Sequence, residues 1–184
     1  TPFMEWLHLS GLQNDYNHLA ANQLVSFRHF YTGNLSIKKN FLLKHGLFDE
    51  DFNEDLHYFE DTELGYRLAK QGLQIRFCRN AEAWHLHDYS LQPYLAGRIN
   101  AARAGRLFCR KHPELKDKIF PTHLPAKEIL RLKFWQALYP LGRLINSKKI
   151  LFNNYQRLVN EALIKYFFLN QRQAPKQRQR RIKI

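Results

Sequence analysis

The sequence predicts a mixed α/β first half followed by an all-helical second half. Up to about residue 87, segments rich in strand-forming residues alternate with short helical patterns. Beyond residue 90, apolar residues recur at helical spacing, with interruptions at prolines. The chain has 184 residues, of which 45% are hydrophobic, so it is long enough to bury a core of its own.

The elements of the first half are short, and 60–71 predicts the clearest helix. Leu64 and Leu68 lie on one face of it, acidic residues occupy its first turn, and Gly72 follows its end. The other predicted elements are helical turns over 1–20, a strand within 23–37 followed by a turn at Gly33-Asn34, a helix over 37–45 capped by Ser36 and ended by Gly46, and strands over 73–78 and 83–86.

The second half predicts long helices. Ser90 is the expected cap of a helix over 91–111, which His112-Pro113 ends. Further helices are expected from Pro125 to about Tyr139 and from Ser147 to about Asn170. The predicted organisation is a first domain over 1–120, a helical extension over 121–170 and a basic, disordered tail over 171–184.

The charge balance predicts an anionic partner. The net charge is +13, and six basic residues of the acid-free tail supply nearly half of it. The aromatic and basic helices of 126–170 either pack on the body or lie on an anionic membrane surface. Nucleic acid is not expected, because the tail lacks aromatic residues between its charges.

Cysteine usage and hydropathy bear on location. Cys78 and Cys109 lack CxxC spacing, so they predict either two buried or free thiols or a disulfide, and the thiols suit a reducing cytoplasm. The sequence contains no run of 18 apolar residues, so it predicts no transmembrane helix. The expected location is therefore cytoplasmic, with peripheral contact to the inner face of the membrane as an extension of that hypothesis.

The acidic pair Glu60-Asp61 is the main catalytic candidate. A carboxylate at a helix start is commonly a capping device. The functional alternative is a general base, which must be an ionised Asp or Glu at the rim of a pocket. We expect the helix N-terminus to lower the pKa of Asp61 and keep it ionised.

Three other patterns allow both a structural and a functional interpretation. His85 and His87 share one face of a strand, so they either pack or ligate a divalent metal. Asp49-Glu50-Asp51 is either a solvated loop or a DxD motif. Gly33-Asn34 is either a turn or part of a pocket lining.

Four blocks in order resemble the C-terminal half of bacterial family 2 glycosyltransferases. They are TGNLSIKK (32–39), GLFDEDF (46–52), EDTELGYRLAKQG (60–72) and AEAWHLH (81–87), and 97–115 is similar to the helix that follows them. The resemblance implies a GT-A-type α/β fold over residues 1–115. It also implies inverting transfer of a sugar from a nucleotide-sugar donor to a glycan or lipid-linked acceptor.

The resemblance also implies roles for individual residues. Asp61 is the implied catalytic base and Glu60 its acceptor-orienting neighbour. His85 is the implied ligand of a divalent cation, Mn²⁺ or Mg²⁺. The implied substrate-binding residues are Gly33 and Asn34 near the donor sugar and Asp49 and Glu50 near the acceptor.

The nucleotide-binding strands and metal-binding DxD of the family's N-terminal half have no counterpart before Phe30. We therefore expect this chain to be the acceptor-side half of a larger enzyme, with most metal ligands outside it and no activity as an isolated fragment. The competing hypothesis is a non-catalytic basic module that binds a membrane surface, nucleic acid or a protein partner.

Overall fold

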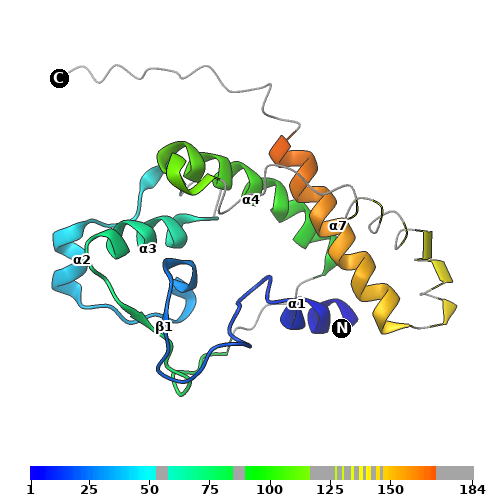
Figure 1. The fold of residues 1–184 in the computed structure, drawn as a ribbon, viewed down its shortest axis with the longest axis horizontal. Coiled ribbons are helices and arrows are strands. Elements are labelled where there is room, and N and C mark those ends of the chain that lie inside the picture. Colours follow the sequence, from blue (N-terminus) through cyan, green and yellow to red (C-terminus); the bar gives the residue numbers. More distant parts are fainter. Residues whose placement is uncertain are drawn as a thin grey trace.

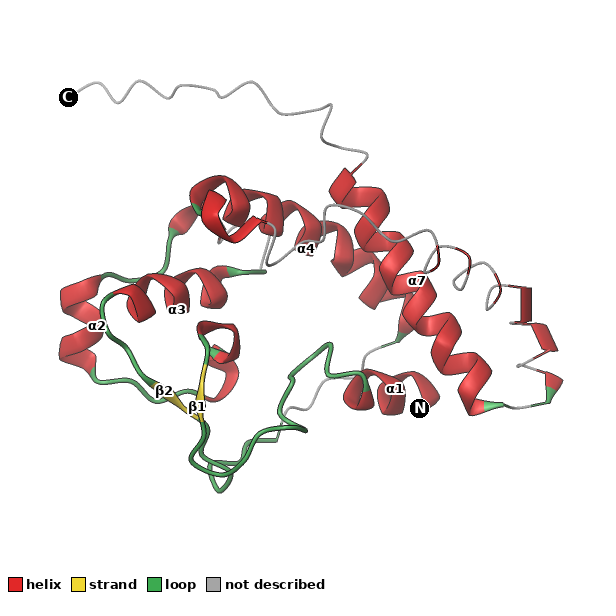
Figure 2. Ribbon diagram, viewed as in Figure 1, coloured by secondary structure: helices red, strands yellow, loops and turns green. Residues whose placement is uncertain are grey.

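The computed structural model describes residues 1–52, 58–84, 90–116 and 147–168, and single positions at 127, 130, 134, 137, 138, 140, 141, 144 and 145; for 161–168 it describes the helix without side chains. The helices are α1 (Pro2–Leu9), α2 (Lys39–His45), α3 (Glu60–Lys70), α4 (Leu91–Lys111) and α7 (Lys148–Phe168), and the strands are β1 (Leu24–Val25) and β2 (Ile75–Arg76). The fold is mixed and mostly helical, with a small two-stranded sheet (Figures 1 and 2).

The sheet joins two segments that are far apart in the sequence. β1 and β2 pair antiparallel, with Leu24 opposite Arg76 and Val25 opposite Ile75. The pairing continues beyond the strands, because the amide of Phe77 donates to the carbonyl of Gln23 at 2.9 Å. The segment that enters β1 is therefore held beside the segment that leaves β2.

Helix α3 lies between the sheet and α4 (Figure 1). Leu64 and Leu68 are buried in one cluster with Phe30, which belongs to the segment between β1 and α2. Gly65 permits the close approach of these parts, because a Cβ at this position would lie 2.5 Å from the Cβ of Phe30. The leucine pair read from the sequence is thus the core face of α3.

The C-terminal part of α4 covers the other side of α3. The buried members of this second cluster are Phe52, Ala104, Phe108 and Leu115. A polar contact accompanies it: Glu63 is 1% exposed, accepts a hydrogen bond from Arg67 Nε at 2.8 Å and lies 3.1 Å from His112 Nε2. The buried carboxylate is therefore paired, as its desolvation requires.

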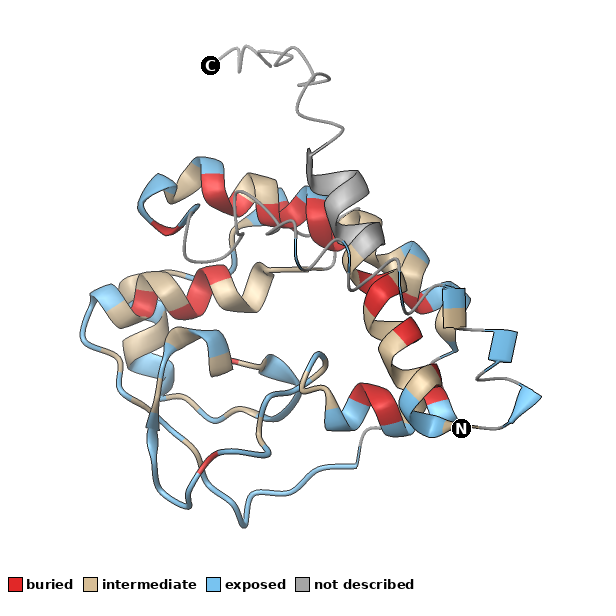
Figure 3. Cartoon of the chain, turned by 45° about the vertical axis from the view of Figure 1, so that its right-hand side comes forward, coloured by how far each residue is buried: buried red, intermediate tan, exposed pale blue. Residues whose placement is uncertain are grey.

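Helix α7 crosses the N-terminal part of α4 and reaches α1 (Figure 1). The third cluster contains Phe3, Trp6 and Leu7 of α1 with Tyr94 and Val159. Figure 3 shows that buried residues concentrate where α1, α4 and α7 meet, whereas the loops around the sheet are largely exposed. None of the described helices combines the length and the apolar character that crossing a membrane requires.

Several predicted boundaries are confirmed, and others are wrong. The helix predicted over 91–111 is found with those bounds, and α2, α3 and α7 begin or end within a few residues of their predicted limits. Both cysteines are free. The strands are shorter than predicted, and most of 26–37 instead forms 3-10 turns and loop.

The predicted cap at Ser36 is wrong, because Lys38 takes the N-cap position of α2. Ser90 holds the predicted N-cap position of α4, but its side chain makes no capping hydrogen bond. Residues 83 and 84 form no strand, and 85–86 lie outside the described residues. The tail over 171–184 and most of the helix predicted after Pro125 also lie outside them.

Candidate active site

A pocket of about 1140 Å³ opens where α3 begins, between the sheet and the N-terminal part of α4. Four predicted site residues line it together: Gly33, Asn34, Glu60 and Asp61. The volume exceeds the range of about 300–1,000 Å³ that is usual for small-molecule sites. The pocket is therefore large enough for a ligand of several rings.

Asp61 is fixed in the first turn of α3. Its Oδ1 accepts a hydrogen bond of 2.6 Å from the backbone amide of Thr62 and one of 3.3 Å from the Thr62 hydroxyl. The helix begins after Phe59, which has a left-handed backbone with φ of 68° and supplies no side-chain cap. Such a conformation is costly for a bulky residue, so surrounding contacts must hold the entrance of α3 in place.

The predicted direction of the Asp61 pKa is wrong. Burial raises the pKa of Asp61 above its ordinary value, although hydrogen bonds from Thr62 and from the backbone amide of Thr32 act to lower it. Desolvation therefore outweighs the donors at the start of the helix. A carboxylate with a raised pKa is a stronger proton acceptor than an ordinary surface aspartate.

Two tyrosines lie near this carboxylate. Burial raises the pKa of Tyr16 and of Tyr31, and the negative charge of Asp61 adds to the effect in both. Their rings meet edge to face with 5.5 Å between centroids. Both phenols are therefore protonated at neutral pH, and both tyrosines line the pocket.

Gly33 and Asn34 belong to the 3-10 turn Thr32–Asn34 at the pocket wall. The side-chain amide of Asn34 donates to the carbonyl of Ala81 at 2.7 Å. This bond ties the turn to the segment 81–84, which also lines the pocket. The side chain of Asn34 therefore stabilises the pocket wall. No atom lies within 4 Å of the place where a Cβ of residue 33 would stand, so the space beside Gly33 is open.

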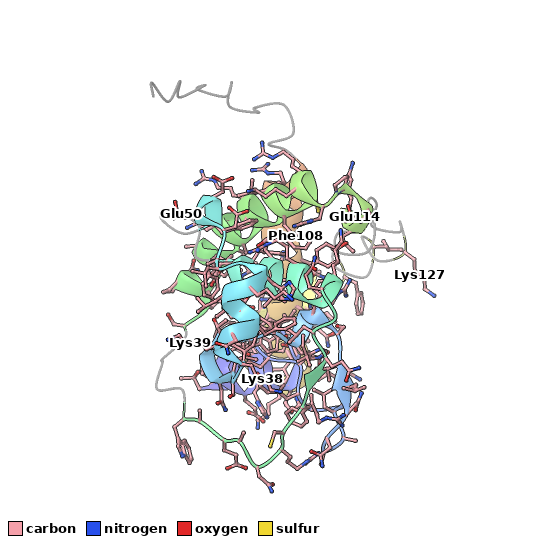
Figure 4. The ribbon with its side chains drawn as sticks, turned by 90° about the vertical axis from the view of Figure 1, so that its left-hand side faces the viewer. Lys38, Lys39, Glu50, Phe108, Glu114 and Lys127 are labelled. Carbon is pink, nitrogen blue, oxygen red and sulfur yellow. The ribbon has the colours of Figure 1, made fainter. Side chains whose placement is uncertain are left out.

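Asp49 and Glu50 are not brought to the pocket. Lys111 of α4 donates to Asp49 Oδ2 at 2.5 Å and also pairs with Asp51 at 2.6 Å. Burial raises the pKa of Asp49, but the hydrogen bonds from Lys111 and the Asp51 amide outweigh it, so the net shift is downward. Figure 4 shows Glu50 on the side of the molecule near α4, away from Lys38 and Lys39.

The predicted metal ligand His85 lies outside the described residues. Within the described part of the chain, no three His, Cys, Asp or Glu side chains gather as a metal site requires. The described residues therefore do not fit a divalent cation by themselves.

Sequence reasoning missed several residues of the pocket. Tyr16 and Tyr31 lie outside the four blocks, and Arg98 lies in the segment 97–115, for which the sequence suggested no residue role. The backbone amide of Thr32 bonds to Asp61, although the TGN block pointed only to Gly33 and Asn34. Tyr31 directly precedes the TGN block, which is the one local signal that pointed near them.

Comparisons with known proteins give a partial match. The chain is 42% identical over 60 residues to a chondroitin synthase of Escherichia coli, 43% to a chondroitin synthase of Pasteurella multocida strain Pm70 and 42% to a hyaluronan synthase of Pasteurella multocida. Those 60 residues are 32% of this chain, but only 8% of the first relative and 6% of the other two. No family model and no solved structure matches the chain. The partial match supports a relationship to glycosyltransferases.

Proposed function

We propose that this chain supplies the catalytic base and the acceptor side of an inverting glycosyltransferase with a family 2, GT-A-type domain. The enzyme would move a sugar from a nucleotide-sugar donor to a hydroxyl of a glycan. The observation that carries the proposal is the buried carboxylate of Asp61 at the start of α3, in a pocket of about 1140 Å³. The partial match to polysaccharide synthases supports it.

Asp61 acts in one step of this mechanism. Its carboxylate takes the proton of the acceptor hydroxyl while that oxygen attacks the anomeric carbon from the face opposite the leaving group. The bond between the anomeric carbon and the donor phosphate oxygen breaks, and its electron pair leaves with the nucleoside diphosphate. The new glycosidic bond therefore has inverted configuration.

The neighbouring residues orient the acceptor. Glu60 and Asp61 are adjacent on a helix, so their side chains point in different directions from the same wall of the pocket. Glu60 can accept a hydrogen bond from a second hydroxyl of the sugar while Asp61 takes the proton. Tyr16 and Tyr31 line the same pocket and are further candidates for contacts with the sugar.

The proposal includes a nucleotide-binding part outside this chain, as the resemblance implies. A divalent cation, with His85 among its ligands, belongs to that same hypothesis. The described residues contain no cluster of His, Cys, Asp or Glu that would hold this cation, so its other ligands belong to the part outside this chain.

The test uses the full-length gene product with a panel of nucleotide sugars and a glycan acceptor. Asp61→Asn should lower sugar transfer by about 10²–10⁴-fold, because general-base catalysis contributes about that factor. The nucleotide affinity of this variant, measured by calorimetry, should stay within about twofold of that of the unsubstituted protein.

Asp51→Asn is the matched control, since Asp51 is an exposed carboxylate that does not line the pocket. Transfer that survives Asp61→Asn would show that Asp61 is not the base. A full-length protein that transfers no sugar from any donor would favour the competing hypothesis of a non-catalytic binding module.

A further inference from the structure

One cation of the pocket is held in an unusual way. Arg76 and Arg79 donate to backbone carbonyls, at 2.6 Å to Asn22 and 2.9 Å to Leu19. The guanidinium of Arg98, by contrast, lies 4.3 Å from the ring centroid of Tyr94 and 5.1 Å from that of Tyr58. Arg98 forms no ion pair with any carboxylate in the described part of the chain.

The Nε atom of Arg98 is buried and has no hydrogen-bond partner among the described residues. A buried donor without a partner destabilises a fold, and the cost is larger when the group is charged. A fold keeps an unpaired buried donor only where another interaction offsets its cost. The pocket that Arg98 lines offers the space for a ligand that would pair with this group.

The side chain of Arg98 is held by one tyrosine from α4 and one from the segment that enters α3. Tyr94 stands one helical turn before Arg98 on α4 and is 5% exposed, within the cluster that includes Phe3. Tyr58 comes from the segment that enters α3, two residues before Glu60. Gly97 lets this ring approach α4, because a Cβ at Gly97 would overlap the Tyr58 hydroxyl.

Stacking on two rings leaves the edge of the guanidinium as its binding surface. Aromatic faces stabilise the cation but satisfy none of its N–H donors. The planar edge matches the two oxygens of a carboxylate or a phosphate group. A neutral hydroxyl would leave the positive charge without a partner, so the geometry favours an anion.

We propose that Arg98 binds an oxyanion of the substrate, beside Glu60 and Asp61 in the same pocket. This inference rests on the proposed function for its substrate class. The oxyanion is either a phosphate group of the nucleotide-sugar donor or the carboxylate of an acidic sugar in the acceptor. Both present the same two-oxygen edge to the guanidinium.

The experiment measures binding without transfer, by calorimetry on the full-length gene product. One arm titrates inorganic diphosphate, and the other titrates a uronic acid, with the corresponding neutral hexose as a reference. Arg98→Gln should weaken the affinity for one of the two anions by at least about tenfold, since a hydrogen bond to a charged group is worth about 1.5–3 kcal/mol.

Arg98→Lys keeps the charge but loses the planar edge, so an intermediate loss is expected. Arg103→Gln on the exposed side of α4 is the matched control and should bind like the unsubstituted protein. Loss of diphosphate binding assigns Arg98 to the donor, and loss of uronic acid binding assigns it to the acceptor.

The proposal is overturned if the unsubstituted protein binds neither anion, or if Arg98→Gln binds both as tightly as the control does. Failure of the proposed function would look different. An Arg98-dependent affinity in a protein that transfers no sugar would keep the anion site and reject the enzyme.

Discussion

The surroundings of Asp61 shift its pKa in opposite directions. The amides of Thr62 and Thr32 favour the ionised carboxylate, whereas burial disfavours it, and burial prevails. The fold therefore keeps a carboxylate where its charge is costly. Such a cost is expected where a group serves catalysis rather than stability.

The raised pKa of Asp61 predicts opposite responses of activity and stability to pH. Because the folded protein holds the Asp61 proton more tightly than the unfolded chain, this residue's contribution to stability is fully present below the unfolded pKa. That contribution is lost as the pH rises through the folded pKa. Transfer needs the ionised form, so its rate should fall on the acid side at a higher pH than an exposed aspartate would give.

Asp61→Asn separates these effects. The variant should unfold at a higher temperature than the unsubstituted protein at pH 7, and the difference should shrink toward pH 4 as Asp61 becomes protonated. In a chain of this size, each 1 kcal/mol gained raises Tm by about 2–4 °C. Thermal melts at both pH values check this, and a lower Tm at pH 7 would contradict the burial argument.

At the scale of the element, α3 is the part that places the candidate base. Its apolar face packs on Phe30, and Glu63 ties it to Arg67 and to His112 at the end of α4. The helix is therefore fixed on two sides, and its first turn is held at the pocket.

The sequence was informative about α3 because its signals are local. The leucine pair, the acidic first turn and Gly72 are all read within one stretch of chain. The strands were predicted too long, because the length of each strand depends on which residues find a pairing partner far away in the sequence. Only two residues of each strand are paired. Arg98 could not be singled out, because its neighbour Tyr58 reaches it through the tertiary fold.

Gly65→Ala tests the close contact of α3. Alanine favours a helix by about 1 kcal/mol over glycine, but its Cβ would lie 2.5 Å from the Cβ of Phe30 and 3.1 Å from the carbonyl of Phe27. Phe30 is buried and cannot move aside freely. The clash should prevail and destabilise the protein by about 1–3 kcal/mol in urea unfolding.

Gly33→Ala is the control for this prediction. A Cβ at Gly33 meets no atom within 4 Å, and its backbone does not require glycine. Its unfolding midpoint should therefore stay close to that of the unsubstituted protein. Equal midpoints for Gly65→Ala and Gly33→Ala would show that α3 tolerates a wider separation from Phe30.

At the scale of the whole molecule, α7 links the last part of the described chain to the first. Val159 lies in one cluster with Leu7 and Tyr94, so α1, α4 and α7 share a core. Lys148 also pairs with Glu5 at 2.9 Å, although an exposed pair of this kind adds at most about 1 kcal/mol. Burial of apolar side chains is the stronger link.

This shared core predicts that a change in α1 is felt throughout the protein. Leu7 is fully buried, and Leu7→Ala should lower the free energy of unfolding by about 2–5 kcal/mol. Leu9→Ala on the same helix is the matched control, because Leu9 is 61% exposed and its truncation should cost less than about 0.5 kcal/mol.

Urea unfolding, monitored by tryptophan fluorescence and by far-UV circular dichroism, measures both variants. The two signals should shift together in Leu7→Ala, since the cluster that contains Leu7 also contains Tyr94 of α4, the helix that covers α3. A shift in fluorescence alone would mean that α1 and α7 unfold separately from the part that holds Asp61.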